Sequence, residues 1–376
     1  MYLKSSELKP ATVVKLSRES AILGRRCHGL SLNESPFPPL PGVLSAAEKA
    51  IRLLNRYPDP TCGALIAELT ARLGLPEECI AVGAGSLSVA ANLVAAMSET
   101  RNAEVMYAWG SGCAGYETVC RIAGAHGVRV PMTDGARQDL DLMVRKATPD
   151  TRVIILGSPH NPTGTVIGHR ELESFLRRVP AETLVLLDEA YHEFVRDPAA
   201  ADGPALCRKY PNLAVLRTFS AAHGLAGLRV GYLIADPAIV ERVLRRTPPY
   251  AVTSVAEQAA VASLRAEHEL AGRVDWIVEE RERVAGQLRA RGFALSRSEA
   301  SFLWIPLPDV GLDLAAAFRR SGIDVRLTTD GGIRITIGSA VANDAVVAAA
   351  TMFTESRAAA VAGTRRARGS LVSQAI

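Results

Sequence analysis

The sequence predicts an α/β protein with a large domain built on a mostly parallel sheet and a smaller α+β domain. Three observations support this class. The chain has 376 residues, of which 48% are hydrophobic and 22% charged, enough for two or three domains with sizeable cores. Short apolar runs alternate with amphipathic stretches through the middle of the chain. Beyond Pro249 the pattern changes to a long helical stretch followed by isolated strands.

The expected strands of the large domain are short apolar runs, which is typical of parallel sheets buried on both faces. They cover 104–108, 152–157, 183–187, 213–217 and 230–235, with helical patterns at 140–147 and 169–179 between them. The smaller domain is expected to hold a long helix over 254–291, strands at 302–307 and 333–337, and a helix at 312–320. The proline-rich segment 36–41 reads as an extended linker between the lobes.

These elements divide the chain into four parts. Residues 1–44 and 251–356 are assigned to the small lobe and 45–250 to the large domain. Residues 357–376 carry four arginines and no acid, and we expect this basic tail to be disordered. Without the tail, basic and acidic residues balance, so a nucleic-acid-binding surface is not indicated.

Composition also excludes other classes. No apolar run approaches the roughly 18 residues of a membrane span, and the first ten residues lack the apolar core of a secretory signal. The six cysteines (27, 62, 79, 113, 120 and 207) form no CxxC pair and show no metal-ligand spacing, so we expect no metal. Reduced thiols favour a cytoplasmic protein.

Four polar segments follow expected strands, at the sheet edge where α/β proteins bind ligands. They are 83–86 (GAGS), 158–164 (SPHNPTG), 188–191 (DEAY) and 218–231 (TFSAAHGLAGLRVG). A glycine-rich turn before a helix suits a phosphate, as do hydroxyls beside an arginine. A carboxylate that ends a buried strand is costly unless it is paired. Taken alone, each segment is explained by a structural turn, and only their combination points to a ligand.

Together, the order and spacing of these segments resemble the class I/II aminotransferases of the fold-type-I pyridoxal-phosphate enzymes, most closely the histidinol-phosphate aminotransferase branch. The resemblance covers roughly residues 28–350. It also includes Leu32-Asn33-Glu34-Ser35-Pro36, Arg56-Tyr57-Pro58-Asp59 and Arg334-Ile335-Thr336-Ile337-Gly338. It implies the fold-type-I architecture, pyridoxal 5′-phosphate as cofactor, and an amino acid or amino-acid phosphate as substrate.

The resemblance also implies residue roles. Asp188 would pair with the ring nitrogen of the cofactor, Asn161 and Tyr191 would bond its 3′-oxygen, and Tyr116 would stack on its face. Gly85, Ser86, Thr218, Ser220 and Arg229 would hold its phosphate. Tyr57 would reach that phosphate from a second subunit, which implies a homodimer. The substrate-binding candidates are Arg334, which would grip the α-carboxylate, together with Arg326 for a distal anion, Asn33, His28 and His223.

The sequence departs from the family at the position of the Schiff-base lysine, which is Ala221. Two interpretations compete: an engineered replacement that traps the external aldimine, or a natural pseudoenzyme. We favour replacement, because every other cofactor contact implied by the resemblance is present. A second departure is Ser111-Gly112-Cys113, in place of the Pro-Thr-Tyr of the family.

Two other function classes stay open. A lyase on the same scaffold would break a different bond, as in decarboxylation, elimination or cyclisation. A 2-oxo acid product that depends on an amino acceptor would distinguish transfer from such chemistry. A non-catalytic cofactor-binding protein is the third alternative, although no DNA-binding domain accompanies it in this chain.

Overall fold

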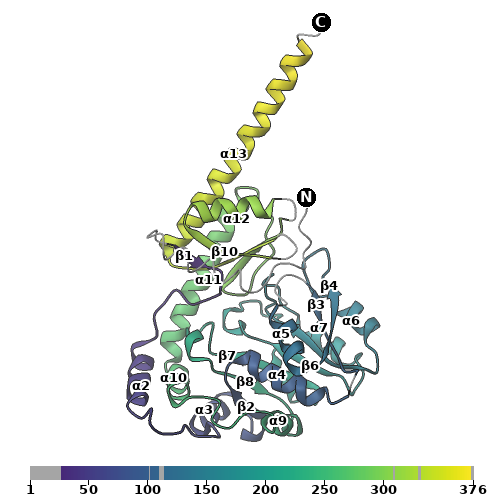
Figure 1. Ribbon diagram of the computed structural model, residues 1–376, viewed down its shortest axis with the longest axis vertical. Coiled ribbons are helices and arrows are strands. Elements are labelled where there is room, and N and C mark those ends of the chain that lie inside the picture. Colours follow the sequence, from purple (N-terminus) through teal and green to yellow (C-terminus); the bar gives the residue numbers. More distant parts are fainter. Residues whose placement is uncertain (1–26, 101, 110–113, 308–309, 329–331, 374–376) are drawn as a thin grey trace.

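The computed structural model describes residues 27–100, 102–109, 114–307, 310–328 and 332–373. Its central feature is a seven-stranded sheet with the order β2-β8-β7-β6-β5-β3-β4 (Figure 1). Neighbouring strands are parallel from β7 to β4, whereas β8 runs antiparallel to both β2 and β7. The strands are β2 (Ile80–Gly83), β3 (Glu104–Trp109), β4 (His126–Pro131), β5 (Thr151–Gly157), β6 (Leu184–Asp188), β7 (Leu213–Thr218) and β8 (Gly231–Ile234).

Both faces of this sheet are buried. Ile154 and Leu156 of β5 belong to one hydrophobic cluster, and the alternating Val153 and Ile155 belong to a second. This arrangement explains the unbroken apolar runs in the sequence. The helices of the large domain are α4 (Ser86–Met97), α5 (Ala114–Ala123), α6 (Leu140–Lys146), α7 (His169–Leu176), α8 (Gly203–Cys207) and α9 (Pro237–Leu244), with short 3₁₀ turns η2 (Glu77–Cys79), η3 (His192–Phe194) and η4 (Ala226–Leu228).

The smaller sheet has four strands in the order β1-β10-β11-β9. They are β1 (His28–Leu30), β9 (Phe302–Ile305), β10 (Ile323–Leu327) and β11 (Ile333–Thr336), packed with α12 (Gly311–Arg320) and α13 (Ala340–Ser373). Strand β1, from the beginning of the described chain, pairs in parallel with β10 from near its end. The expected strands at 302–307 and 333–337 are present in shorter form, whereas β1 and β10 were not predicted.

The boundary between the lobes in the structure differs from the one expected at residue 250. Helix α10 (Ser254–Arg265) packs against α2 (Pro41–Ile51) and α3 (Gly63–Leu73), beside the large sheet (Figure 1). Helix α11 (Glu267–Arg289) then contacts α13 and β9 of the small lobe as well as η3 of the large domain. The chain therefore passes between the lobes along α11, because the apolar face of α10 is buried against α2 and α3.

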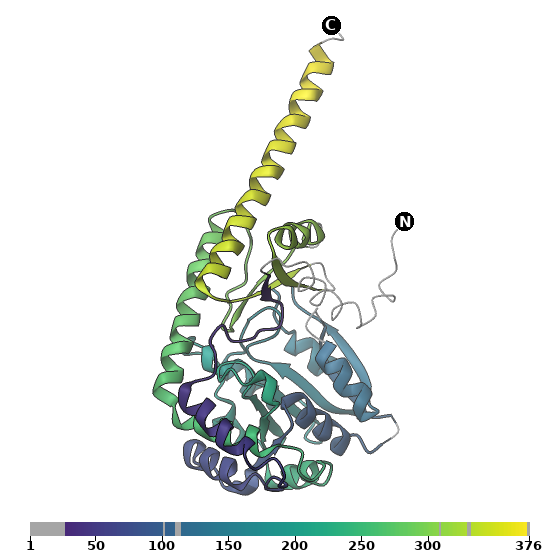
Figure 2. The same ribbon diagram turned by 60° about the vertical axis from the view of Figure 1, so that its left-hand side comes forward.

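The basic tail also differs from expectation. Instead of ending near residue 356, α13 continues as one helix to Ser373 and projects from the body of the molecule (Figure 2). Alanine and arginine have high intrinsic helix propensities, and the tail is rich in both, so its composition favours a helix. None of the described helices combines the length and the apolar character needed to cross a bilayer.

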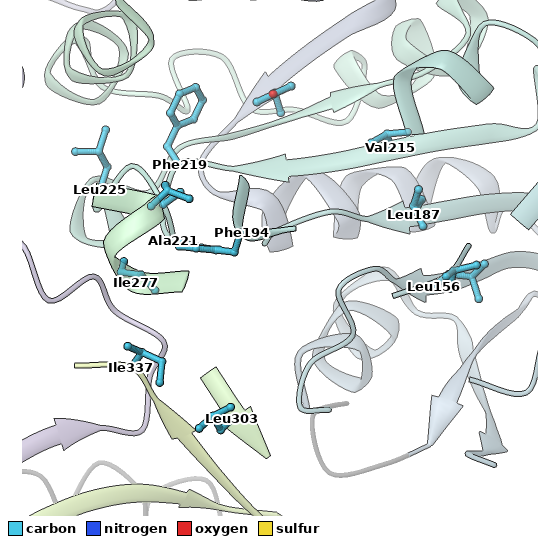
Figure 3. Packing of buried hydrophobic residues seen from close by; sticks show 14 of the residues in the cluster. Leu156, Leu187, Phe194, Val215, Phe219, Ala221, Leu225, Ile277, Leu303 and Ile337 are labelled. Carbon is cyan, nitrogen blue, oxygen red and sulfur yellow. The ribbon is translucent and has the colours of Figure 1, made fainter. Parts of the chain in front are cut away.

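The two lobes share one hydrophobic core. Leu156 and Leu187 of the large sheet belong to the same cluster as Leu303 and Ile337 of the small lobe (Figure 3). Phe194, which follows the end of β6, lies in this cluster too. The core brings the small sheet against the carboxyl ends of the parallel strands, where the site lies.

Candidate active site

A cavity of about 380 Å³ lies at the carboxyl ends of β5, β6 and β7 and is closed by residues of the small lobe. This is the edge where ligands bind in open α/β sheets. The residues that line it come from both lobes: Ser31, Leu32, Asn33, Ser86, Leu87, Gly115, Tyr116, Pro159, Asn161, Pro162, Asp188, Ala190, Tyr191, Thr218, Ser220, Ala221, Ala226, Arg229, Arg326, Thr328 and Arg334. Most of the polar members are residues singled out from the sequence, whereas Ser31 and Thr328 were not, because neither belongs to a recognisable motif.

Asp188 is the last residue of β6 and places a carboxylate deep in the cavity. The hydroxyl of Tyr116 donates to its Oδ2 at 2.9 Å, and the backbone N–H of Ala190 donates to Oδ1 at 3.1 Å. Burial raises the pKa of Asp188, and these two hydrogen bonds only partly oppose the shift. A buried carboxylate in this state favours a cationic partner in the cavity.

A second group of polar side chains lies across the cavity. The amide of Asn33 donates to the hydroxyl of Tyr191 at 2.8 Å, and the amide of Asn161 lies 3.4 Å from the same oxygen. Arg334 donates to Oδ1 of Asn161 at 2.7 Å and to the backbone carbonyl of Ser31. These bonds hold the Tyr191 phenol and the Arg334 guanidinium in fixed positions at the junction of the lobes.

Arg334 has unused binding capacity. Its side chain is buried, which lowers the pKa of the guanidinium. Its Nε has no hydrogen-bond partner among the described residues. A buried donor without an acceptor is costly, and a carboxylate can accept from a guanidinium at two positions. The arrangement suits a carboxylate ligand.

The amino end of α4 and the loop before β8 form an anion-binding cradle. Gly85 has φ +90°, and a Cβ there would lie 2.4 Å from Nη2 of Arg229. A Cβ on Gly231 would lie 2.6 Å from the backbone nitrogen of Ser86. Arg229 donates to Oγ of Ser220 at 3.2 Å. Backbone N–H groups at a helix amino terminus, hydroxyls and a guanidinium are the donors that phosphates prefer.

Ala221 lines the same cavity as Asp188, Ser220 and Arg229 and contributes only a methyl group to it. No lysine of the described chain lines the cavity. The structure therefore leaves the centre of the site without a primary amine, in agreement with the sequence.

Several expected site residues lie elsewhere in the single chain. His28 is in β1 and pairs with Ile323, outside the cavity lining. His223 turns away from the cavity, because its Nδ1 lies 2.8 Å from Oγ of Ser263 on α10. Tyr57 is 83% exposed and packs on Tyr250, with ring centroids 4.8 Å apart. The segment 110–113, where the sequence departs from the family, lies outside the described residues.

The fold and the donor set together define a pyridoxal-phosphate-type transferase scaffold. The chain belongs to the class I and II aminotransferase family, whose family model matches residues 25–351. It is 46% identical over 339 residues to an aromatic amino acid aminotransferase of Streptomyces avermitilis, covering 90% of this chain and 94% of that protein. It is also 46% identical to a protein of the same name from Thermobifida fusca over 324 residues, 86% of this chain and 89% of that one.

Solved structures agree on the fold. A histidinol-phosphate aminotransferase from Sinorhizobium meliloti in complex with pyridoxal-5′-phosphate has a TM-score of 0.83 and 26% identity, covering 93% of this chain and 98% of that one. An aspartate aminotransferase from Thermus thermophilus with maleate has a TM-score of 0.79 at 20% identity, covering 92% and 97%. The cofactor of the family is pyridoxal 5′-phosphate. The cavity contains a buried carboxylate, a group of polar side chains at the junction of the lobes and an anion-binding cradle, and this set of groups fits that cofactor.

Proposed function

We propose that this chain binds pyridoxal 5′-phosphate in the cavity and recognises aromatic amino acids, with turnover impaired by the alanine at position 221. The observation that carries the proposal is Asp188, a buried carboxylate whose only hydrogen-bond donors among the described residues are Tyr116 and Ala190. Such a group is unfavourable in the cofactor-free protein and favourable once a cationic ring nitrogen lies against it.

Different residues of the chain would hold different parts of the cofactor. Asp188 would keep the ring nitrogen protonated, while Asn161 and Tyr191 would donate to the ring oxygen. Ser86, Ser220 and Arg229 would hold the phosphate at the amino end of α4. When bound, the cofactor supplies an electron sink for the bonds at the substrate α-carbon.

Arg334 would bind the α-carboxylate of the substrate. Its Nη1 is already oriented by Asn161, and its unpaired Nε is the donor that a carboxylate would satisfy. The aromatic character of the substrate is supported by the names of the relatives at 46% identity. Histidinol phosphate, after which the branch that the sequence most resembles is named, appears in the name of a solved structure at 26% identity.

Ala221 explains why we expect impaired turnover. A methyl group can neither bond covalently to a carbonyl carbon nor carry a proton between two atoms. The phenol of Tyr191 is a poor substitute, because burial raises its pKa above the usual value for tyrosine. The chain thus keeps the groups that bind and orient while lacking the group that transfers protons.

We also propose that the active form is a homodimer. Exposed apolar side chains gather around the end of α2, where Ile51, Leu53, Leu54 and Tyr57 are each at least half exposed. An apolar face of this kind is unusual on a monomer. A second copy of the chain would cover it and bring Tyr57 to the phosphate cradle of its partner. Sedimentation showing a monomer that binds the cofactor tightly would contradict this part of the proposal.

Arg326 favours a second candidate, an amino acid with a distal phosphate or carboxylate. Arg326 lies directly opposite Arg334 in the β10–β11 pair and lines the cavity. No acidic side chain of the described residues forms an ion pair with it. A substrate with two anionic groups would neutralise both guanidiniums.

One titration tests the cofactor and another separates the substrates. Pyridoxal phosphate binding, followed by its visible absorbance, should be weakened more than tenfold by Asp188→Ala, and unchanged affinity would refute the assignment. Competition binding of phenylalanine and of O-phosphoserine, which carries an α-carboxylate and a distal phosphate, should then be measured on the loaded protein and on its Arg326→Ala variant. Tighter binding of O-phosphoserine than of phenylalanine, lost in Arg326→Ala, supports the second candidate, and tighter binding of phenylalanine, unchanged in Arg326→Ala, supports the first.

A further inference from the structure

A second cavity, of about 430 Å³, lies behind the site, on the side where α3, α10 and α11 cover the large sheet. Its volume is within the range of small-molecule sites. One wall is apolar and is formed by Leu69, Leu73, Leu264, Leu270, Ala271 and Val274. None of these residues belongs to the cofactor or substrate machinery described above.

The opposite wall carries an ionised carboxylate. Burial alone would raise the pKa of Glu193, but at the acidic pH where this group titrates His192 is protonated, and its charge together with the neighbouring His223 lowers the pKa of Glu193 to about 2. The other acidic and basic side chains at this cavity, apart from the histidines, form ion pairs: Arg217 with Glu189 at 2.8 Å, Arg72 with Glu267 at 2.6 Å and Arg196 with Asp275 at 2.5 Å. Glu193 is therefore the acid of this cavity that has no arginine or lysine partner among the described residues, and it gives this wall its negative charge.

Two acceptors at this wall lack donors. Nδ1 of His192 lies 3.1 Å from the carbonyl oxygen of Glu189, which can only accept, so Nδ1 carries the proton and Nε2 is a bare acceptor. Burial lowers the pKa of His192 to about 4, so the ring is neutral at pH 7. Oε2 of Glu193 lies 3.3 Å from that same Nδ1, yet it accepts no hydrogen bond from any described residue.

We propose that the second cavity binds an organic ammonium ion with an apolar body. The ammonium donates to Nε2 of His192 and is held by the charge of Glu193, while the apolar body packs against the leucines of α3, α10 and α11. A metal ion does not fit the same groups, since the described residues contain no arrangement of three His, Cys, Asp or Glu side chains able to hold one. The inference does not depend on the proposed function of the first cavity.

Some residues that line the second cavity are next to residues that line the first, so the experiment must distinguish binding in the two cavities. His192 follows Tyr191, and His223 lies two residues after Ala221, so each of these segments lines both cavities. A primary amine could condense with pyridoxal phosphate in the first cavity. The ligand for the test is therefore N,N-dimethyl-2-phenylethylamine, a tertiary amine that is cationic at pH 7.5 and cannot form an imine.

Isothermal titration calorimetry on the full chain should show one site for this amine. We expect at least tenfold weaker binding of 2-phenylethanol, which lacks the charge, and of 3-phenylpropionate, which reverses it. Glu193→Gln should weaken the amine at least tenfold. Glu241→Gln makes the same chemical change on the exposed surface of α9 and should leave binding unchanged.

A second variant keeps the test decisive if Glu193→Gln lowers the melting temperature. Ala271 is exposed on α11 at the mouth of the cavity, so Ala271→Trp should block entry and abolish binding without disturbing the fold. Equal affinity for amine and anion, or unchanged binding in Ala271→Trp, would overturn the proposal. So would complete loss of amine binding on loading pyridoxal phosphate, because the amine would then occupy the first cavity.

Discussion

Replacing Ala221 with lysine tests the central feature of the site. Ala221 lines a cavity of about 380 Å³, which has room for the three methylenes and the amine that lysine adds. Nearby guanidiniums of Arg229 and Arg334 lower the pKa of an added amine, which favours its neutral, nucleophilic form. The substitution therefore supplies both a nucleophile and a proton carrier where the chain has neither.

The expected gain follows from the chemistry that is missing. A positioned acid–base group contributes roughly 10²–10⁴-fold to a rate. At about 1.4 kcal/mol per factor of ten, this is about 3 to 6 kcal/mol of activation free energy. Loss of covalent exchange at the cofactor adds to the deficit of the alanine form, so the lysine variant should be at least 100-fold faster.

The assay is formation of phenylpyruvate from phenylalanine with a 2-oxo acid acceptor, measured with pyridoxal phosphate present. Ala221→Met is the matched control, because methionine fills similar space without an amine, and it should be as slow as the parent. If the parent and the lysine variant turn over at comparable rates, the reasoning fails. It also fails if the methionine variant matches the lysine variant.

Three other substitutions give distinct outcomes. Asp188→Asn should raise the melting temperature of the cofactor-free protein more at pH 7 than at pH 4. Burial raises the pKa of Asp188 in the folded state, so this carboxyl group lowers the stability of the fold as the pH rises through that pKa. A difference in melting temperature between variant and parent that does not change with pH would contradict this. Gly231→Ala should cost about 1–3 kcal/mol in urea unfolding, because its Cβ would lie 2.6 Å from the Ser86 nitrogen, whereas Gly227→Ala, with nothing within 4 Å, should cost far less. Arg334→Lys in the Ala221→Lys background should raise KM for phenylalanine more than tenfold, since lysine cannot replace the two-point contact, and an unchanged KM would remove Arg334 from the substrate site.

The sequence predicted the large sheet well because burial on both faces leaves a simple signature. Strand β5 was expected at 152–157 and lies at Thr151–Gly157, where consecutive apolar side chains fill two cores in turn. Strand β10 was missed, because its Asp324 and Arg326 interrupt the apolar run and, apart from Ile323, its residues are partly buried or exposed. The long helix expected over 254–291 is two helices with a break at Ala266, a residue that carries no helix-ending signal.

The site residues were predictable as far as motifs reach. Asp188, Asn161 and Arg229 were identified because each lies in a distinctive segment directly after a strand. The direction in which a side chain points within such a segment was not available from sequence. His223 illustrates this limit, because its contact with Ser263 depends on the packing of a helix some forty residues later.

The hydrophobic core shared by the two lobes determines that they should unfold together. Leu303 and Ile337 pack in the same cluster as Leu156 and Leu187, so the small lobe cannot melt while the large sheet keeps its core intact. The two walls of the first cavity, one carrying Asp188 and the other Arg334, are held in register by this shared packing. A cavity-creating change such as Leu303→Ala typically lowers the free energy of unfolding by about 2–5 kcal/mol. It would thus loosen the spacing between Asp188 and Arg334 without altering either side chain.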